Sequence, residues 1–491
     1  MTESPRDLDS VADVLRSAGL LTEARGPGDV ALYGVCQDSR SVRSGDLFFA
    51  WNGVDRDGHD FVGDAVRGGA VAAIVERPLD LDVPQLVVSN ARRAAAIAAT
   101  AVVGNASDRL FTIGITGTNG KSTTALIVRH LLERRGPAAA LGTLGLVDAD
   151  GVRPGTEGLT TPGPVQVAVW LWELAEGGMK AVVMEASSHA LDQHRVDGVE
   201  FDVGVFTNLS RDHLDYHRDF AGYLGAKSRL VHLVSTDGTL VVNRDDRTWD
   251  ELDTHGRSVR TFAVDADADV RAENLVAGPA GSSFDLVLDG ERARVDLPLL
   301  GRYNVENALA AAATAAAAGL GISEIADGLC TVPQVSGRLE AVITEPYTVL
   351  IDFAHTPDAL DGALSAARAL TAGRLIVLFG AGGDRDSTKR RPMAEAVARF
   401  ADVVILTSDN PRTEDPEAIL DDLAEGLSER DFVRMVDRRA AICHALEIAQ
   451  AGDTVVLAGK GHETYQVIGT EKRPFDERLI VSECVDARGA A

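Results

Sequence analysis

The stretch LFTIGITGTNGKSTT, residues 110–124, decides the fold. Residues 110–116 are mostly apolar and predict a buried parallel strand, and residues 122–134 after the turn have helical spacing. Glycines let the backbone approach a phosphate group, N–H groups at the helix start point at it, and Lys121 adds positive charge. The usual P-loop has a glycine where this chain has Ile115, so a plain strand–helix turn with a surface lysine is the alternative. The strand–turn–helix order favours a nucleotide phosphate site, where the Ser122 hydroxyl can bind Mg²⁺.

Length and charge narrow the possible classes of protein. The chain has 491 residues and a mass of 51.8 kDa, which suggests about three domains of about 150 residues each. Lys and Arg number 48 and Asp and Glu 74, so the net charge is −26. Such a surface repels nucleic-acid phosphates and anionic lipid. We therefore expect no nucleic-acid partner and no membrane insertion.

Cysteine usage and the absence of targeting signals suggest a cellular compartment. The four cysteines are far apart and form no C-x-x-C pair, which argues against a disulfide scaffold or zinc ribbon and favours reduced thiols. The acidic N-terminus is not a secretory signal, and the longest apolar stretch, residues 308–320, is too short to span a bilayer. We expect a cytoplasmic protein without an obligate protein partner. The cysteines are Cys36, Cys330, Cys443 and Cys484.

Short apolar runs alternate with segments of helical spacing. This order predicts an α/β architecture, with parallel sheets covered by helices on both faces. Polar breaks near residues 104–108 and 332–337 divide the chain into an N-terminal domain 1–107, a central nucleotide-binding domain 108–337 and a C-terminal domain 338–491. Residues 239–300 alternate in polarity and predict antiparallel strands attached to the central domain. The predicted buried strands are residues 110–116, 181–187, 203–209, 375–380, 402–409 and 454–459.

Acidic and histidine side chains follow two strands of the central domain. Glu185 stands at a strand's carboxyl end, where α/β sheets bind ligands, and can complete a Mg²⁺ shell begun by Ser122. The histidines of MEASSHALDQHR, His189 and His194, are by themselves more often helix residues than metal ligands. A second group combines Asp212, His213, Asp215 and His217. It favours Mg²⁺ over zinc, because no H-E-x-x-H motif accompanies it, and a solvated polar loop is the alternative.

Three polar clusters follow predicted strands in the last third of the chain, at residues 381–392, 408–416 and 459–466. Arg385 and Arg412 belong to the first two, and we expect them at the same edge of one sheet. Arginine binds carboxylate through two parallel hydrogen bonds, so this pair predicts a substrate with two carboxylates. Taken alone, the Asn-Pro pair before Arg412 is also an ordinary turn signal.

The ordered motifs of the chain resemble those of the Mur ligases, ATP-dependent amino-acid ligases of peptidoglycan precursor synthesis. The resemblance covers nearly the whole chain and is very specific. It implies an N-terminal domain for a UDP moiety, a central P-loop-type parallel-sheet domain for ATP, and a C-terminal Rossmann-like domain for the incoming amino acid. The motifs are DSRSVRSGDLFFA, TGTNGKST, LTTPGP, MEASSHALDQHRV, FTNLSRDHLDYH, GRYNVENALAA, SGRLE, IDFAHTPDAL, GGDRD, SDNPR and GKGHE.

The resemblance also implies roles for individual residues. The catalytic residues would be Lys121, Glu185, His213 and Lys227, and the ATP contacts Gly117, Thr118, Asn119, Gly120, Lys121, Ser122, Asn304, Asn307, Arg338 and Asp352. The UDP-linked dipeptide would contact Ser39, Thr160, Thr161, Ser187, Gln193 and Arg195. The diaminopimelate contacts would be Arg385, Asp409, Asn410, Pro411, Arg412, Gly459 and Glu463. Ser122, Glu185, His213 and Lys227 would share two Mg²⁺ ions.

Spacing alone makes Lys227 an ordinary surface lysine, and only the resemblance singles it out. The family carries a carbamylated lysine at this position. Addition of CO₂ to a neutral amine turns a cation that repels Mg²⁺ into an anionic oxygen ligand.

The implied reaction joins an amino acid to a nucleotide-linked peptide. The D-Glu γ-carboxylate of UDP-N-acetylmuramoyl-L-Ala-D-Glu would attack the γ-phosphate of ATP, and the amine of meso-diaminopimelate would attack the resulting acyl phosphate. The string DNPR, residues 409–412, is typical of diaminopimelate-adding members, and Arg412 would pair with the second carboxylate. We also expect domain closure that excludes water. The alternatives are L-lysine or LL-diaminopimelate as acceptor, a folylpolyglutamate synthetase, and a nucleotide-dependent binding module without ligase activity.

Overall fold

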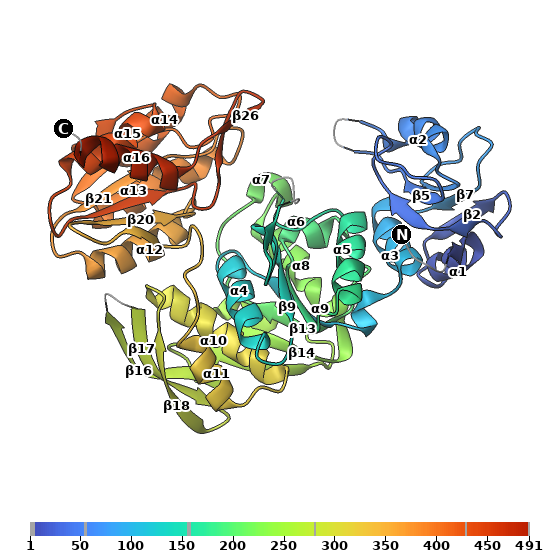
Figure 1. Cartoon of the computed structure of the whole chain (residues 1–491), viewed down its shortest axis with the longest axis horizontal. Helices are drawn as coiled ribbons and strands as arrows, with labels where there is room; N and C mark the ends of the chain where they lie inside the picture. The colour runs from blue at the N-terminus through green and yellow to red at the C-terminus, as the bar shows by residue number, and fades with distance from the viewer. Residues whose placement is uncertain (1–4, 54–55, 155–158, 279–280, 428–429, 490–491) are drawn as a thin grey trace.

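Three mixed α/β units follow one another along the chain. The computed structural model describes residues 5–53, 56–154, 159–278, 281–427 and 430–489. In Figure 1 the N-terminal unit lies at one end of the molecule, the C-terminal unit at the other, and the central unit between and below them. Each unit has its own sheet, so the prediction of α/β architecture is confirmed. The predicted domain limits at residues 107 and 337 fall between the sheets and stay predictions.

The N-terminal sheet has five strands in the order β2-β7-β6-β5-β4. Neighbouring strands are parallel except β2, which runs antiparallel to β7. Helices α1 and α3 pack on one face and α2 on the other. The strands are β2 Leu21–Arg25, β4 Gly34–Cys36, β5 Asp46–Phe49, β6 Ala72–Val75 and β7 Gln85–Val88. The helices are α1 Leu8–Ser17, α2 Val62–Gly68 and α3 Ala91–Val103, and the short strands β1 Arg6–Asp7 and β3 Ala31–Leu32 form a separate pair.

The central sheet has eleven strands in the order β11-β10-β9-β12-β8-β13-β14-β15-β16-β17-β18. Strand β8 lies between β12 and β13 and is parallel to both. The strands are β8 Phe111–Thr116, β9 Ala138–Gly142, β10 Gly145–Asp148, β11 Gly151–Arg153, β12 Ala181–Glu185 and β13 Phe201–Phe206. They continue with β14 Val234–Asn243, β15 Ser258–Ala263, β16 Val270–Gly278, β17 Gly281–Leu288 and β18 Glu291–Leu297.

Helices cover both faces of the central sheet, as predicted. On one face, α4, α10 and α11 bury an apolar layer that includes the alanines of α10. The opposite layer draws on α5, α6, α8 and α9. The helices are α4 Lys121–Leu132, α5 Pro164–Glu176, α6 Ser188–Asp192, α7 Leu214–His217, α8 Phe220–Ser228, α9 Leu230–Leu233, α10 Arg302–Ala317 and α11 Ile322–Leu329.

The prediction of antiparallel strands over residues 239–300 is only partly right. Strands β16, β17 and β18 pair antiparallel. Strands β14, β15 and β16 instead pair parallel with one another, and β14 extends the sheet from β13. The parallel pairs were missed because their connections carry little helix, whereas a parallel crossover usually contains one.

The C-terminal sheet has six strands in the order β19-β20-β24-β21-β22-β23, all parallel except β19. Strands β21 and β24 are buried along their whole length, as their unbroken apolar sequences predict. The strands are β19 Glu340–Ile343, β20 Thr348–Asp352, β21 Leu375–Phe379, β22 Val403–Leu406, β23 Val433–Arg434 and β24 Thr454–Ala458, with the hairpin β25 Tyr465–Ile468 and β26 Glu471–Pro474. The helices are α12 Pro357–Leu370, α13 Arg390–Phe400, α14 Pro416–Ala424, α15 Arg438–Ile448 and α16 Glu477–Gly489.

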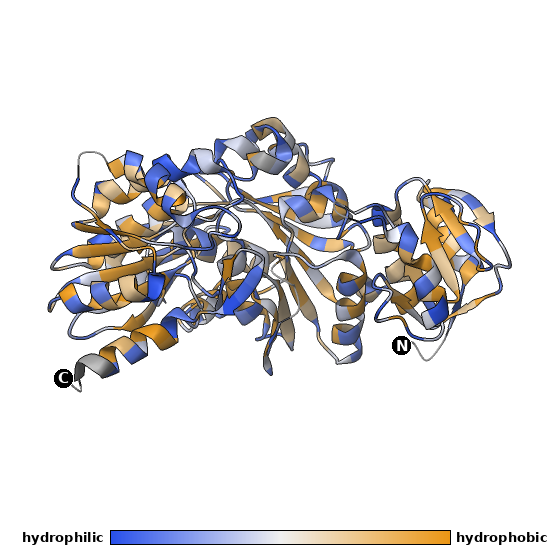
Figure 2. Cartoon of the chain, turned by 90° about the horizontal axis from the view of Figure 1, so that it is seen from above, coloured by the Kyte–Doolittle hydropathy of each residue, from blue (hydrophilic) through white to orange (hydrophobic). Residues whose placement is uncertain are grey.

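The hydropathy of the ribbon follows this layering. In Figure 2 the strands are mainly hydrophobic, while the loops that join them are mainly hydrophilic. No helix in the described ranges is both long and apolar enough to cross a membrane.

One expectation about the cysteines is wrong. The structure joins Cys443 of α15 to Cys484 of α16 in a disulfide, whereas the sequence led us to expect reduced thiols. The two residues are 41 positions apart, and only the packing of the two helices brings them together. Cys36 and Cys330 are free thiols, as expected.

Candidate active site

The loop between β8 and α4 has the backbone form of a phosphate-binding turn. Gly117 and Gly120 both have positive φ, at 146° and 84°. A Cβ on Gly117 would lie 1.8 Å from Thr207 Oγ1, and a Cβ on Gly120 would lie 2.3 Å from Asn307 Oδ1. Neither position therefore has room for a side chain, and the glycines bring the turn directly to the N-terminus of α4, the kind of helix end that binds anions.

A second loop holds this turn in place. Thr207 donates to the Asn119 carbonyl at 2.7 Å, and the Asn208 side chain accepts from the Asn119 N–H at 2.9 Å. The Thr118 N–H donates to the Asn208 carbonyl at 2.7 Å. Thr207 and Asn208 are not among the residues predicted from the sequence, although they belong to the FTNLS motif that follows β13. Their position directly after a buried strand is the sequence feature that could have indicated a role at the site.

Two lysines meet at Gly117. Lys121 Nζ donates to the carbonyls of Gly117 and Thr118 at 2.9 and 2.8 Å. Lys227 Nζ, from α8, donates to the same Gly117 carbonyl at 2.6 Å and lies 4.5 Å from the Tyr223 ring centre. Burial lowers the pKa of Lys121, opposed by the charges of Glu185 and Asp212.

Lys227 is almost completely buried, with 1 % of its surface exposed. Burial and the nearby Lys121 charge hold the pKa of its amine well below the ordinary value. A lysine with that environment favours the neutral amine. Lys227 is therefore not the surface lysine that its spacing suggests.

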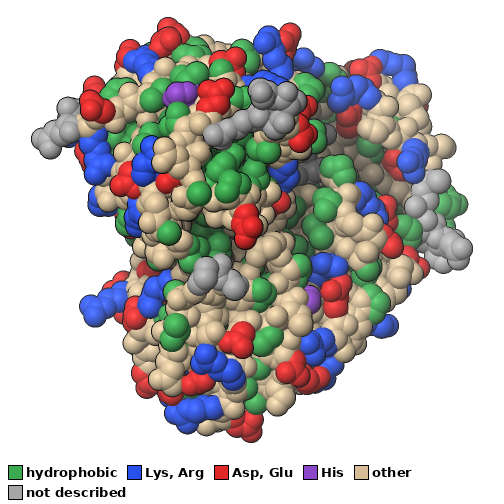
Figure 3. Space-filling view, turned by 60° about the vertical axis from the view of Figure 1, so that its left-hand side comes forward, with side chains coloured by type: hydrophobic (Ala, Val, Ile, Leu, Met, Phe, Trp, Pro, Cys, Tyr) green, Lys and Arg blue, Asp and Glu red, His purple; other side chains and the backbone are tan. Residues whose placement is uncertain are grey.

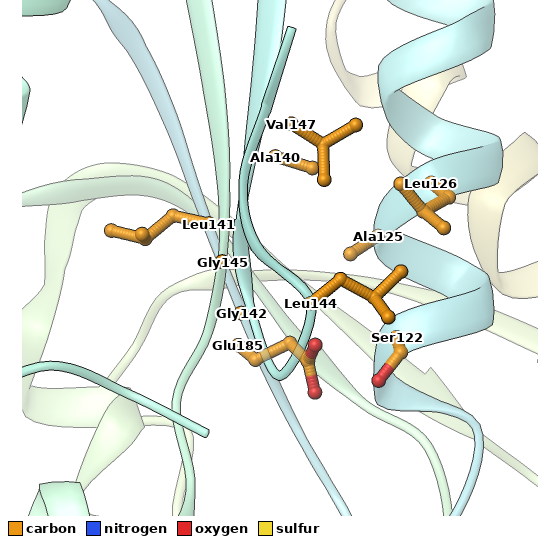
Figure 4. A pocket seen from close by; sticks show the side chains of 10 residues that line it. All are labelled: Ser122, Ala125, Leu126, Ala140, Leu141, Gly142, Leu144, Gly145, Val147 and Glu185. Atoms are coloured by element: carbon orange, nitrogen blue, oxygen red, sulfur yellow. The ribbon is translucent and has the colours of Figure 1, made fainter. Parts of the chain in front are cut away.

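Glu185 and Ser122 face each other across a small cavity (Figure 4). The Glu185 carboxylate accepts hydrogen bonds from the Thr143 N–H at 2.8 Å and the Thr143 hydroxyl at 3.1 Å. Glu185 is 2 % exposed and Ser122 6 % exposed. The arrangement offers one carboxylate and one hydroxyl to a cation, which suits Mg²⁺ when substrate phosphates supply further oxygens.

His213 lies on the loop that follows β13, directly before α7. Its Nε2 is 3.5 Å from Asp212 Oδ2, and its ring centre is 4.8 Å from that of His189. Burial lowers the pKa of His213 to about 3, opposed by Asp212, so the imidazole is neutral and able to act as a metal ligand. Among the described residues, no three His, Cys, Asp or Glu side chains form a ready metal cluster. The side chain of Asp215 lies outside the described residues.

Five of the six residues predicted to contact the UDP-linked dipeptide form one hydrogen-bonded group around Glu185. Thr161 donates to the Glu185 carbonyl at 2.6 Å and accepts from the Ser187 N–H at 3.2 Å. Arg195 donates to the Thr161 carbonyl at 2.9 Å and to Gln193 Oε1 at 2.7 Å. These contacts place an arginine and several hydroxyls beside the Ser122–Glu185 cavity. Thr160 also belongs to the group, through a 3.3 Å hydrogen bond with Thr143.

Ser39 lies in the N-terminal unit, in the turn after β4. Its neighbours Asp38 and Arg40 form an exposed ion pair at 2.7 Å. Gln37, two positions earlier, comes close to the start of α5: a Cβ on Gly163 would lie 3.1 Å from Gln37 Nε2. The turn that carries Ser39 therefore lies next to the segment that begins with Thr160.

Residues predicted to contact ATP lie on two sides of the phosphate loop. Asn307 of α10 accepts from the Thr124 hydroxyl at 3.3 Å and donates to Asn304 at 3.1 Å. Arg338, from the segment before β19, donates to Ser122 Oγ at 3.3 Å. A residue next to the C-terminal sheet thus reaches the phosphate loop of the central unit.

The Arg338 side chain has a fixed position. Its guanidinium lies 4.7 Å from the Phe353 ring centre. Asp352 is buried and accepts from the Leu339 and Ala354 N–H groups, both at 2.7 Å. Burial raises the pKa of Asp352, and Arg338 opposes that shift. Phe353 thus acts as a platform for Arg338.

The two arginines of the C-terminal unit come together, as expected from their strand-end positions. A Cβ on Gly382 would lie 3.0 Å from Arg412 Nη1 and 3.8 Å from Arg385 Cγ. Burial and the adjacent Arg385 charge lower the pKa of Arg412. Arg412 also has a positive φ of 52° and donates to the Gly383 carbonyl at 2.6 Å. Two neighbouring arginines can offer charged hydrogen-bond donors to an anion.

Carboxylate and amide groups lie beside the arginines. Asn410 donates to Glu463 Oε2 at 2.9 Å, and a Cβ on Gly459 would lie 2.8 Å from Asp409 Oδ2. The Pro411 carbonyl fills the space beside Gly383, at 1.9 Å from a Cβ built there. The sequence-predicted acceptor residues therefore gather at the carboxyl ends of β21, β22 and β24.

The molecular surface is hollowed near the middle of the face shown in Figure 3.

Known proteins resemble the chain over nearly its whole length. Family models match residues 31–107 as the Mur ligase family catalytic domain, 115–315 as the Mur ligase middle domain and 337–461 as the Mur ligase glutamate ligase domain. A UDP-N-acetylmuramoyl-L-alanyl-D-glutamate–2,6-diaminopimelate ligase of Geobacter sulfurreducens is 44% identical, with 96% of each chain covered. A solved structure of a ligase of the same name has a TM-score of 0.70, 32% identity and 99% coverage of both chains.

A more distant solved structure shares the fold alone. Folylpolyglutamate synthase of Mycobacterium tuberculosis, complexed with ADP and AMPPCP, has a TM-score of 0.64 and 20% identity. It covers 75% of this chain and 92% of its own.

Proposed function

This chain belongs to the Mur ligase family, and on that premise we propose that it is an ATP-dependent ligase that joins diaminopimelate to the D-Glu γ-carboxylate of UDP-N-acetylmuramoyl-L-Ala-D-Glu. The observation that carries the proposal is the pairing of two sites. One is a phosphate loop with Lys121 and Glu185, and the other is a strand-end site with Arg385 and Arg412. An enzyme that activates the carboxylate of one substrate needs the first site. An enzyme that binds an amino acid with two carboxylates needs the second. We also propose that it works in the cytoplasm, where ATP and nucleotide-linked precursors are present.

The phosphate loop would bind the ATP phosphates. In the structure Lys121 donates to two carbonyls of its own loop, and a phosphate oxygen would replace those acceptors. The γ-carboxylate of the dipeptide attacks the γ-phosphorus, ADP leaves, and an acyl phosphate forms. Lys121 stabilises the negative charge that spreads over the transferring phosphoryl group.

Ser122, Glu185 and His213 would hold Mg²⁺, which neutralises phosphate charge when bound. The fit rests on the facing hydroxyl and carboxylate and on the neutral imidazole of His213, a form that can bind a metal ion. Thr143 positions the Glu185 carboxylate through two hydrogen bonds.

Lys227 would be carbamylated. Its neutral amine can add CO₂ and release one proton, which leaves an anionic carbamate in place of a buried amine. The support is its burial and lowered pKa, together with a hydrogen bond to the phosphate-loop carbonyl of Gly117.

The dipeptide would bind beside the phosphate loop, where it would contact Arg195, Gln193, Thr160, Thr161 and Ser187. Ser39 would contact the uridine. The adenosine part of ATP would contact Asn304, Asn307, Arg338 and Asp352.

The amine of the acceptor attacks the acyl phosphate, phosphate leaves, and an amide bond forms. Positioning of the two substrates supplies much of the rate.

At the acceptor site, Arg385 and Arg412 would bind the carboxylate of the distal amino-acid head, and Glu463 its ammonium. The segment Asp409–Arg412 and Gly459 would complete the pocket. L-Lysine lacks the distal carboxylate and would leave the arginines without a partner. We propose the meso isomer as the natural acceptor.

Product analysis tests the proposal. The protein is incubated with ATP, Mg²⁺, UDP-N-acetylmuramoyl-L-Ala-D-Glu and meso- or LL-diaminopimelate, and the products are separated and weighed by mass spectrometry. We expect a UDP-linked tripeptide that contains the meso isomer. A product made only with the LL isomer would change the assigned acceptor, and no tripeptide with either would overturn the proposed function.

A further inference from the structure

A buried lysine beside the acceptor site has no role in the proposed reaction. Lys460 follows β24 and has no exposed surface. Its Nζ donates to Glu463 Oε2 at 3.0 Å, to Asn410 Oδ1 at 3.1 Å and to Asp409 Oδ1 at 3.4 Å. A fully buried ammonium is costly unless it is paired and hydrogen-bonded, and Lys460 has both kinds of partner.

The three acceptors of Lys460 come from two separate loops. Asp409 and Asn410 follow β22, whereas Glu463 follows β24. Strand β21 lies between those two strands in the sheet. Lys460 therefore joins the two loops at the point where their side chains would face the distal head of the acceptor.

Further contacts hold these loops in the same arrangement. Asn410 Oδ1 also accepts from the Val467 N–H at 2.9 Å, and Gln466 donates to the Asp409 carbonyl at 2.8 Å. Burial raises the pKa of Asp409, but Lys460 and the adjacent Arg438 overcome that effect and keep the carboxyl ionised. The hairpin, both loops and Lys460 thus form one connected polar group.

We propose that Lys460 is a positioning residue that sets the geometry and charge of the acceptor pocket. It directs Asn410 and Glu463 and offsets the charges of Asp409 and Glu463. This inference rests on the proposed function, because it assumes that the acceptor amino acid binds beside Glu463 and Arg412.

The charges around Arg412 explain why the Lys460 ammonium would affect binding of the acceptor. Burial and Arg385 lower the pKa of Arg412, and the nearby charges of Asp409 and Glu463 oppose that shift. Without the Lys460 ammonium, Glu463 would lose an ion pair and would be free to turn toward Arg412. It would then compete with the substrate carboxylate for that guanidinium. Loss of Lys460 should therefore weaken acceptor binding while the phosphoryl-transfer site, in another unit, stays intact.

The test compares Lys460→Gln with wild type and with Lys180→Gln, a substitution at an exposed lysine of the central unit. We expect the KM for diaminopimelate to rise at least tenfold in Lys460→Gln, with the KM for ATP within twofold of wild type. Exchange of label between ADP and ATP, measured with the UDP-linked dipeptide and no acceptor, should also stay within twofold. Lys180→Gln should match wild type in all three measurements.

Two results would overturn the inference. One is an unchanged KM for diaminopimelate in folded Lys460→Gln, and the other is an equal loss of the exchange reaction, which indicates general damage. If Lys460→Gln does not fold, Lys460→Met, which keeps an unbranched side chain without the charge, replaces it, with the same expected rise in KM and the same contradicting results. Tripeptide formation by the wild-type protein distinguishes failure of the proposed function from failure of this inference. If wild type makes no tripeptide, the proposed function fails before Lys460 is tested.

Discussion

Lys121 and Lys227, from α4 and α8, donate hydrogen bonds to the same carbonyl oxygen, that of Gly117, at 2.9 and 2.6 Å. Two ammonium groups so close together repel each other, and the nearby Lys121 charge helps to lower the pKa of Lys227. The two lysines differ in their proposed roles. Lys121, at the start of α4, would bind a phosphate group, and the buried Lys227, whose pKa is lowered, would be the site of carbamylation.

Replacement of Lys121 tests the phosphate loop. We expect Lys121→Met to lower kcat for phosphate release by about 10²–10³-fold, because it removes a fixed charge aimed at the transferring phosphoryl group. The melting temperature should stay within a few degrees of wild type. Steady-state kinetics and a thermal melt check both, and a variant with near-normal kcat would contradict the role of Lys121.

Carbamylation of Lys227 predicts a dependence on CO₂. Protein equilibrated with ¹³C-labelled bicarbonate should show a carbamate carbon by NMR, and Lys227→Ala should lack that signal. Because carbamylation needs the neutral amine, the signal should fall as the pH is lowered through the depressed pKa of Lys227. An unlabelled wild-type protein that is fully active in CO₂-free buffer would exclude the carbamate.

Arg412 should determine which acceptor is used. Arg412→Ala removes a charged hydrogen bond to the distal carboxylate, worth about 3 kcal/mol, so kcat/KM for diaminopimelate should fall by about 100-fold. The matched control is Arg473→Ala, since Arg473 is exposed on β26 and pairs with Glu471. Equal kinetics for Arg412→Ala and the control would remove Arg412 from the pocket.

The close fit of Gly117 predicts a strong effect of one methyl group. Gly117→Ala combines an unfavourable φ with a Cβ 1.8 Å from Thr207 Oγ1, so we expect a loss of at least about 3 kcal/mol in the free energy of unfolding and loss of activity. Gly225→Ala is the control, because Gly225 lies in α8 with nothing within 4 Å of an added Cβ. It should gain about 0.5–1 kcal/mol. Urea unfolding gives both values.

His462 should make the protein less stable in acid. Burial lowers its pKa to about 3, with Arg338 and Arg478 adding to the effect, whereas in the unfolded chain it titrates near 6.5. The unfolded state therefore binds the extra proton between these values, so the protein loses stability as the pH falls below about 6.5. His462→Gln should lose less stability than wild type between pH 7 and pH 5 in urea titrations. An identical pH dependence would contradict this prediction.

The sequence predicts elements whose local pattern is strong. Residues 110–116 form β8 and the glycine turn leads into α4, because an apolar run, glycines of positive φ and a periodic segment act locally. The placement of Arg385 beside Arg412 also follows from the sequence, since parallel strands end at one edge of their sheet.

Features that depend on long-range packing were not predictable in this way. The burial of Lys227 and Lys460 depends on partners in other segments, and no spacing indicates it. The Cys443–Cys484 disulfide depends on how two helices pack. Only the family resemblance singles out Lys227, and no sequence pattern singles out Lys460.

The most direct measurement is phosphate release from ATP in the presence of UDP-N-acetylmuramoyl-L-Ala-D-Glu, with meso-diaminopimelate or L-lysine as acceptor in parallel. We expect rapid release with diaminopimelate and little with L-lysine, because only diaminopimelate has a distal carboxylate for Arg385 and Arg412. Release only with L-lysine, or no release with either acceptor, would contradict the proposed function and acceptor.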